Sequence, residues 1–471
     1  MAQTEAETEV PQEAADLLTT DVVQNGLRAA FGDRTHCLRC LGRPLSRAAR
    51  GTPNATVGKR IAEVLGIAAV DDPLDCAWCE GLFEDLDRYV MLIVDALAEV
   101  DHETFVVGTR FHPDMDRKEA AVIAHCAGFE EHFEPIRGEM NREVGGRVQE
   151  RTQKTVQFER PEVTVLLDPH FDQIELTLRS VFIFGRYRKF DRTVPQTKWP
   201  CRSCRGHGCA RCAGTGKTYE TSVEELVAEA AVAAYGATDE SFHGAGREDI
   251  DALMLGTGRP FVLELKEPRY RKPRDPDDPR RILTLEELEE RINAHARPRA
   301  EVEGLRPSDK DEVIAIKEAV VDKAYRAHVV AEAPVRRAAL DVAIREVIAE
   351  PIQQRTPERV AHRRADKVRP RSVHRVEVVS FGHHARATLE QEEDEDQADQ
   401  PAPETTETFT LDILAESGTY IKELVHSDEG RTQPSFAAIL GIPMKVAYLD
   451  VVGVGAMDAP KRAAPSAGTE E

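Results

Sequence analysis

The amino-acid sequence predicts an α/β protein with at least two domains. Helical and strand-like segments alternate from about residue 18 to 195. A second domain then opens with a capping box formed by Ser222 and Glu225, followed by apolar residues at helical spacing and a stop at Gly236. The chain has 471 residues and 41% hydrophobic content, which suffices for two or three domains with sizeable cores.

The individual elements follow from local patterns. Residues 105–111 predict a strand, and residues 116–125 predict a short helix. Residues 163–168 and 174–184 predict the two strands of a β-hairpin. In the last domain, residues 256–265 predict a turn that enters a strand.

Composition shifts predict the boundaries. Residues 1–16 contain five acids and no base, and residues 390–407 contain nine acids and no base, so both segments are expected to be solvated. The Pro- and Arg-rich residues 268–279 predict a loop. The predicted regions are a disordered acidic tail (1–17), an accessory region (18–195), a cysteine-rich knuckle (196–217), the last domain (218–457, with the acidic insertion 390–407) and a tail (458–471).

The charge balance is strongly acidic. The chain carries 62 Lys and Arg against 84 Asp and Glu, a formal net charge of −22, and only 15 of the bases are Lys. Such a charge normally argues against a nucleic-acid partner. Abundant carboxylates with few Lys are also typical of proteins from halophiles, so the acidity can reflect the solvent. No run approaches the roughly 20 apolar residues of a membrane span, and no signal peptide is visible, so a cytoplasmic protein without a membrane partner is expected.

Eight of the nine cysteines form four CxxC pairs, which predicts metal binding in a reducing compartment. The first two pairs are separated by a segment long enough for a helix at 59–65. Together they predict one structural zinc site, with buried free thiols as the alternative. These residues are Cys37, Cys40, Cys76 and Cys79.

The other four cysteines lie closer together and predict a second structural zinc. An iron–sulfur cluster remains open, because spacing does not distinguish between tetrahedral thiolate sites. The residues are Cys201, Cys204, Cys209 and Cys212. The cluster resembles the cysteine-rich repeats of J-domain co-chaperones, which need several copies. The following Gly214-Thr-Gly-Lys-Thr218 lacks the first glycine of a phosphate loop and a preceding strand, so nucleotide binding is rejected.

The stretch from Gly244 to Asp251 holds the strongest candidate for chemistry. Small residues permit a tight loop, and Arg247 and Asp249 follow it. A carboxylate there is a plausible nucleophile or base beside an arginine that can bind phosphate. From the residues alone, a salt-bridged surface loop is the favoured interpretation.

Several motifs together resemble a known family. GREDID at 246–251 is followed by MLGTGRPFVLEL at 254–265, SGTYIKELVHSDEGRTQPS stands at 417–435, and KAYRA stands at 323–327. With the cysteine cluster at 199–212, these motifs are similar to those of the archaeal and eukaryotic pseudouridine synthases that modify positions 54 and 55 in the T arm of tRNA. The resemblance covers 199–455 strongly and 30–195 more loosely.

The resemblance implies roles for four residues. Asp249 matches the catalytic aspartate that attacks the target nucleotide, so that the uracil can detach, rotate and reattach through carbon without an organic cofactor. Tyr325 matches the aromatic residue that stacks on the base and assists proton removal. Lys422 matches the basic partner of the aspartate, and Arg247 matches the arginine that holds phosphate or fills the space of a flipped base. Ser427 departs from the family pattern, in which glycine is commoner.

The family also implies a fold, which is an α/β catalytic domain with a mostly antiparallel sheet, helices on one face and a cleft across the other. In that fold Asp249 lies on a loop beside a strand at 261–265, and residues 445–454 form the last strand. The family's cleft is complete in one chain, so a monomer is expected.

Two basic segments independently suggest RNA binding. Residues 185–190 interleave bases and aromatics, and residues 355–375 hold eight bases and two acids, a net charge of +6. Residues 85–195 resemble a THUMP-type RNA-binding module. A tRNA partner is therefore expected. Two alternatives stay open, namely a THUMP-bearing tRNA enzyme of another class and a non-enzymatic RNA-binding or chaperone-like zinc protein.

Overall fold

The computed structural model describes residues 10–32, 35–362, 364–382 and 403–455. The predicted tail at 458–471, residues 1–9 of the first tail and residues 390–402 of the acidic insertion lie outside them. The prediction of disorder up to residue 17 is wrong for Gln12–Leu17, which forms helix α1 with Ala14 buried. The last residues of the predicted insertion are likewise ordered, because strand β13 begins at Thr405.

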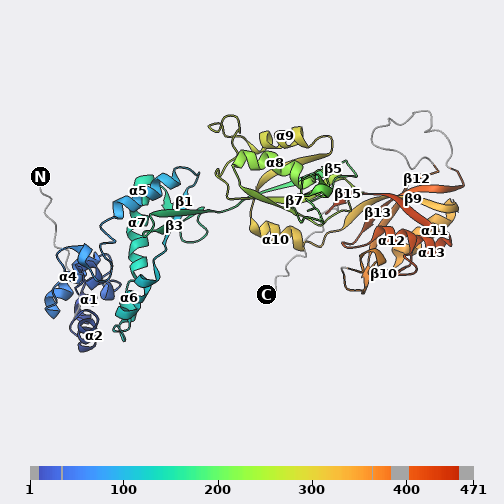
Figure 1. Ribbon diagram of the computed structural model, residues 1–471. Coiled ribbons are helices and arrows are strands. Elements are labelled where there is room, and N and C mark those ends of the chain that lie inside the picture. The colour runs from blue at the N-terminus through green and yellow to red at the C-terminus, as the bar shows by residue number, and fades with distance from the viewer. Residues whose placement is uncertain (1–9, 33–34, 363, 383–402, 456–471) are drawn as a thin grey trace, which may run out of the picture. The chain divides into compact units, whose positions relative to one another are not determined.

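The chain forms two compact units. The N-terminal unit comprises residues 1–179 together with 267–271, and the C-terminal unit comprises 180–266 and 272–471. Figure 1 shows the elements of each unit along the chain. The segment 267–271, part of the predicted loop at 268–279, thus packs with the N-terminal unit.

The N-terminal unit contains a four-stranded sheet of order β2-β1-β3-β4, with helices before it and between its strands. Only the β3–β4 pair is antiparallel, and β1 pairs in parallel with β2 and β3. Its further elements are α2 (Asp21–Phe31), α3 (Leu38–Gly42), α4 (Asn54–Leu65), α5 (Leu86–Leu97), β1 (Thr104–Thr109), α6 (Pro113–Ile123), α7 (Ile136–Thr152), β2 (Thr155–Val156), β3 (Val163–Asp168) and β4 (Gln173–Leu178).

The predicted hairpin is only partly right. Its first strand is β3, but its second strand ends at Leu178. Most of the remainder of the segment belongs to β5 (Val181–Lys189), which pairs with β7 and β8 in the other unit. Those partner strands lie far along the chain, so no local pattern reveals the change of sheet.

The C-terminal unit is built on an eight-stranded, mostly antiparallel sheet of order β12-β13-β9-β15-β7-β5-β8, with β6 beside β7. Among these strands only β15 and β7 pair in parallel. The α/β fold with a mostly antiparallel sheet is therefore confirmed. The strands are β6 (Asp239–Gly244), β7 (Leu253–Lys266), β8 (Ala300–Ser308), β9 (Lys323–Arg336), β12 (Val373–Phe381), β13 (Thr405–Ala415) and β15 (Met444–Val454); a separate small sheet holds β10 (Ile352–Arg355), β11 (Val368–Arg371) and β14 (Thr432–Gln433).

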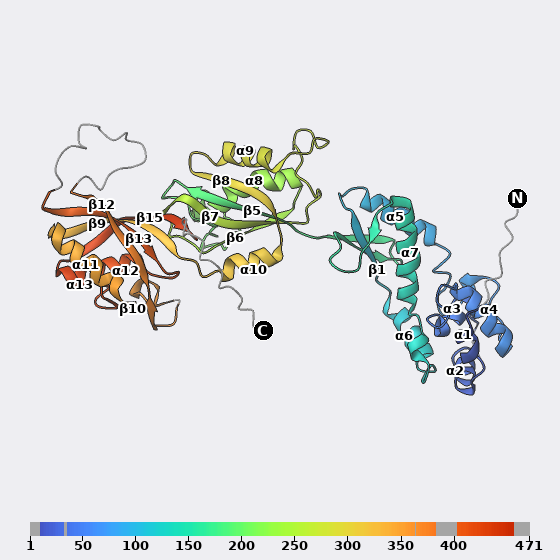
Figure 2. The same ribbon diagram turned by 180° about the vertical axis from the view of Figure 1, so that it is seen from behind.

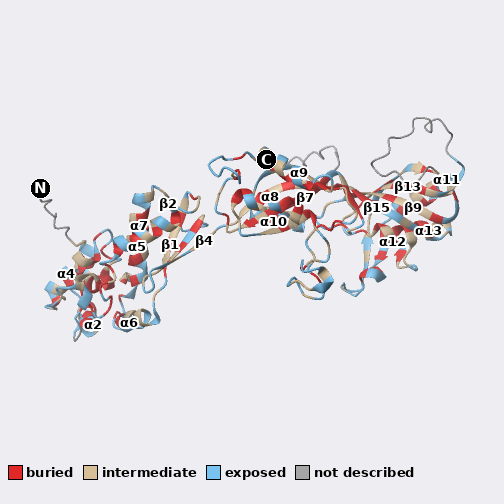
Figure 3. Cartoon of the chain, turned by 45° about the horizontal axis from the view of Figure 1, so that its top comes forward, coloured by how far each residue is buried: buried red, intermediate tan, exposed pale blue. Residues whose placement is uncertain are grey.

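The helices of this unit pack on two cores. One core joins α8 (Val223–Tyr235) and α9 (Leu285–Ala296) to β5, β7 and β8, and the other joins α11 (Arg337–Ala349), α12 (Ile421–His426) and α13 (Phe436–Leu440) to β9, β12 and β13. Figure 3 shows buried residues both on the strands of the sheet and on the helices that pack against it. Tyr325 of β9 packs against both cores.

Helix α8 confirms the capping prediction. Ser222 accepts a hydrogen bond from the amide of Glu225, and Gly236 ends the helix with φ at 57°. The expectation that helices cover one face is wrong for α10 (Lys310–Glu318), which lies on the opposite side of the strands from α8 and α9 (Figures 1 and 2). Because α10 buries only Val313, it adds little to a core.

Strand β7 also differs from the prediction, because it runs through the expected turn at 256–258. Gly256 (φ 58°) and Gly258 (φ 67°) make this possible. A Cβ at Gly256 would lie 1.9 Å from the carbonyl oxygen of Val452, so only glycine fits.

None of the described helices combines the length and the hydropathy of a membrane span.

Candidate active site and cysteine clusters

Asp249 lies on the loop between β6 and β7, and a buried network holds that loop. The carboxylate of Glu248 pairs with the guanidinium of Arg259 at 2.9 Å, and both side chains are 1% exposed. Tyr187 donates its hydroxyl to Glu248 at 2.9 Å, and Arg259 donates to the carbonyl of Ala245 at 2.8 Å. The loop is therefore fixed through Glu248, the residue that precedes Asp249, and through the carbonyl of Ala245.

Two further side chains fix the loop backbone. Gln196 donates to the carbonyl of Gly246 at 3.0 Å and to the hydroxyl of Tyr187 at 2.8 Å. The fully buried Lys189 donates to the carbonyl of Ile250 at 2.7 Å. Burial lowers the pKa of Lys189 to about 8, since a charged ammonium is costly to desolvate. The Asp249 side chain itself remains 46% exposed, so a held carboxylate faces solvent.

Three predicted site residues converge here. The Nζ of Lys422, on α12, lies 3.8 Å from an Asp249 carboxylate oxygen and 3.1 Å from one of Asp251. Tyr325, on β9, interacts electrostatically with Asp249. Burial raises the pKa of Tyr325 to about 12, and the charge of Asp249 adds to this despite the opposing effect of Arg259. The phenol is therefore neutral near pH 7.

Arg247 points elsewhere. Its guanidinium lies 5.0 Å from the ring centre of Trp199, which in turn packs edge-on against Tyr219 at 5.5 Å. Trp199 directly precedes the second cysteine cluster, so this cluster positions the aromatic partner of the motif arginine.

Sequence reasoning missed one close neighbour of Asp249. Arg359, between β10 and β11, places Nη1 3.5 Å from the Asp249 carboxylate and Nε 2.7 Å from Glu423. Glu423 is 1% exposed and follows Lys422 on α12. Arg359 was visible only as one member of the basic run at 355–375.

The structure contradicts part of the prediction for one of the two basic segments. Residues 185–189 of the predicted RNA-contact segment 185–190 lie in strand β5, in which Tyr187 and Lys189 are fully buried, so that prediction is wrong for these side chains. Strand β5 lies between β7 and β8, and side chains of such a central strand point alternately to the two faces of the sheet. Several arginines of the run 355–375 are paired within the fold, namely Arg355 with Asp366, Arg359 with Glu423 and Arg371 with Glu416.

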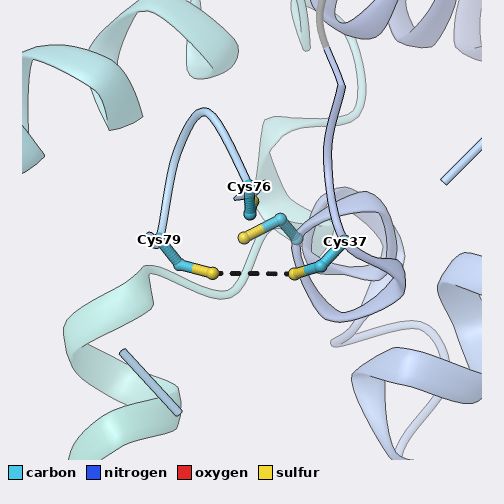
Figure 4. Close-up of side chains that lie close together, drawn as sticks. Cys37, Cys76 and Cys79 are labelled. Atoms are coloured by element: carbon cyan, nitrogen blue, oxygen red, sulfur yellow. Dashed lines mark hydrogen bonds between the residues drawn. The ribbon is translucent and has the colours of Figure 1, made fainter. Parts of the chain in front are cut away.

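Both cysteine clusters have geometry that fits a tetrahedral metal. In each set of four, the sulfur atoms all lie within 4.8 Å of one another. A tetrahedral zinc–thiolate site, with Zn–S bonds of about 2.3 Å, places its sulfurs about 3.8 Å apart. The Sγ atoms of Cys37 and Cys79 are 3.6 Å apart, and Figure 4 shows these sulfurs turned toward one another and toward Cys76. Cys204 and Cys212 are 3.8 Å apart.

The surroundings of the clusters support thiolate ligands. In the second cluster, the amides of Cys209 and Gly216 both donate to the sulfur of Cys212 at 3.2 Å. In the N-terminal unit, the fully buried Arg43 lies beside the first cluster and pairs with Glu139 at 2.5 Å. Both groups can therefore hold a metal ion.

Comparison with known proteins matches this architecture. The family described as "Pus10, C-terminal" matches residues 182–455, and "Pus10 THUMP domain, archaeal" matches residues 89–168. The chain belongs to the Pus10 family. It is 38% identical to the tRNA pseudouridine synthase Pus10 of Halorubrum lacusprofundi, over 93% of this chain and 98% of that protein. It is 39% identical to the Pus10 of Methanothermobacter marburgensis, over 90% and 96%.

Membership in the Pus10 family confirms the prediction of a pseudouridine synthase from its motifs, and the THUMP match confirms that module within the predicted segment. Halorubrum is a halophile, which agrees with the acidic, Lys-poor composition. The structure "Crystal Structure of a Cbf5-Nop10-Gar1 Complex" aligns with a TM-score of 0.29 at 15% identity, over 57% of this chain and 49% of that one.

Proposed function

We propose that this chain isomerises uridine to pseudouridine at position 54, position 55 or both in the T arm of tRNA, with Asp249 as the nucleophile and no organic cofactor. One observation supports this most directly. A half-exposed carboxylate on a rigid loop faces two cations, Arg359 and Lys422. Two cations within about 4 Å hold the carboxylate in one place, which suits a nucleophile.

The other residues have separate roles in this proposal. Tyr325 stacks on the target base, and its raised pKa favours a neutral ring over a phenolate base. Lys422 holds Asp249, and Arg247, resting on Trp199, binds a phosphate or fills the position of the flipped base. The protein acts as a monomer in the cytoplasm, and the THUMP module provides further RNA contacts.

Mapping of modified uridines in tRNA transcripts tests this function. The wild type should form pseudouridine at 54 or 55, and Asp249→Ala should form none while still binding the tRNA. Asp341, an exposed carboxylate on α11 that pairs with Arg337, provides the matched control, and Asp341→Asn should remain active. Transcripts with cytidine at either position show which one is used. Binding without modification by the wild type would favour a tRNA-binding protein of another class.

We further propose that each cysteine cluster holds a structural zinc ion. Because all four positions are cysteine thiolates, neither metal has an open site for substrate. Metal analysis should find two zinc ions per chain, and the variants Cys37→Ser and Cys201→Ser should each lose one. Iron at the second cluster, or no metal in either, would contradict this assignment.

A further inference from the structure

Arg359 lies at the centre of a chain of charges that ends at Asp249. Its Nη1 is 3.5 Å from the carboxylate of Asp249, closer than the Nζ of Lys422 at 3.8 Å. Lys422 is also shared, because its Nζ lies nearer to Asp251, at 3.1 Å. Of the two cations, Arg359 is therefore the closer partner of Asp249.

The guanidinium of Arg359 is anchored on its other side. Its Nε donates to Glu423 at 2.7 Å, and the second carboxylate oxygen of Glu423 is buried without a hydrogen-bond partner. A desolvated carboxylate holds its one cationic partner firmly. The guanidinium also lies 5.8 Å from the ring centre of Tyr420.

The backbone that carries Arg359 is fixed as well. Arg359 belongs to a short 3-10 helix, Glu358–Val360, whose first amide donates to Asp428 at 3.1 Å. Asp428 lies in a turn with Ser427 (φ 78°) and Glu429 (φ 54°), three successive residues with positive φ. Such backbone persists only where the surroundings determine it. Turn, short helix and buried carboxylate together fix the direction of the guanidinium.

We propose that Arg359 is a positioning residue, which holds the carboxylate of Asp249 in its attacking orientation while Glu423 holds Arg359. This inference rests on the proposed function of the site. It extends that function to a second cation, supplied by the β10–β11 loop in addition to Lys422.

The consequence is a dependence of the reaction rate on this guanidinium. The charged groups near Asp249 are Arg359 and Lys422, and Lys422 also pairs with Asp251. Although burial alone lowers the pKa of Arg359, its pairs with Glu423 and Asp249 raise that pKa overall, so the guanidinium stays charged. Removing it leaves the shared Lys422 to hold the carboxylate of Asp249.

The test measures single-turnover pseudouridine formation together with tRNA affinity. Arg359→Gln should slow the reaction about tenfold at neutral pH, because the carboxylate loses its orientation, with little change in affinity. Arg359→Lys should be intermediate, because lysine keeps the charge but cannot bridge two carboxylates. Arg337→Gln, which removes an exposed arginine on α11, should match the wild type.

A second variant covers the case in which Arg359→Gln fails to fold because Glu423 is left buried and unpaired. The double variant Arg359→Gln/Glu423→Gln removes both charges and should show the same loss of rate. An unchanged rate in a folded variant would overturn the inference, as would a loss of rate explained wholly by weaker tRNA binding. If the wild type forms no pseudouridine, the proposed function fails first, which distinguishes the two results.

Discussion

The buried pair Glu248–Arg259 supports the whole loop that carries Asp249, so its disruption should destabilise the C-terminal unit. Glu248→Gln preserves size but leaves the guanidinium of Arg259 uncompensated at 1% exposure. Removing one partner of a buried ion pair costs about 3–5 kcal/mol. We therefore expect the free energy of unfolding of this unit to fall by that amount.

The double variant Glu248→Gln/Arg259→Met separates charge from packing. Replacing both partners of a buried pair leaves no isolated charge, so the double variant should lose less than the single one. The assay is urea unfolding in molar KCl, followed by tryptophan fluorescence. The chain has two tryptophans, so a Trp78→Phe background leaves Trp199 as the reporter of the C-terminal unit.

The single variant Arg259→Met completes the comparison. If the double variant loses as much unfolding free energy as Glu248→Gln and Arg259→Met lose together, this reasoning is refuted. Such a loss would mean that the two groups contribute independently and that the pair is not the unit that holds the loop. A Glu248→Gln variant as stable as the wild type would refute it as well. Arg326→Gln is the matched control, because Arg326 pairs with Asp412 at 2.8 Å with both groups partly exposed, and such pairs contribute about 0–1 kcal/mol.

Three further predictions concern stability. Burial, and then the charge of Glu224, raises the pKa of Glu240 to about 7. The stabilising contribution of Glu240 is therefore lost as pH rises from about 4.5 through 7. Measured by unfolding at both pH values, Glu240→Gln should be more stable than the wild type by about 1–2 kcal/mol at pH 8, after allowing for solvent screening, and equally stable at pH 4. Ser427→Gly should raise the unfolding free energy by about 1 kcal/mol, because glycine adopts positive φ without strain; no gain in a urea titration would contradict this. Glu139→Ala leaves Arg43 fully buried without its carboxylate and should cost the N-terminal unit about 3–5 kcal/mol, as measured by urea unfolding with Trp78 of that unit as the fluorescent reporter.

The parts of the fold that local signals determine could be predicted from the sequence. Helix α8 begins at the cap Ser222 and ends at Gly236 as expected, because both residues act within one turn of the helix ends. Strand β5 could not be placed in its sheet, because its partners β7 and β8 follow it by many residues. An apolar run does not indicate which strand it pairs with.

The candidate site shows the same division. Asp249, Tyr325 and Lys422 were predicted because family motifs mark them, and the fold brings them together. Arg359 was not singled out, because its place beside Asp249 depends on a turn at 427–429 and on the burial of Glu423. Charge counting within the run 355–375 also did not detect pairing with acids elsewhere in the chain, such as Glu416 and Glu423.

The most direct test of the central claim is the amount of pseudouridine that Asp249→Asn forms in a T-arm substrate under single-turnover conditions. Asparagine keeps the size and position of the side chain but removes the carboxylate nucleophile. The account predicts wild-type tRNA binding, an intact fold and no pseudouridine at position 54 or 55. Pseudouridine at a rate close to that of the wild type would contradict it.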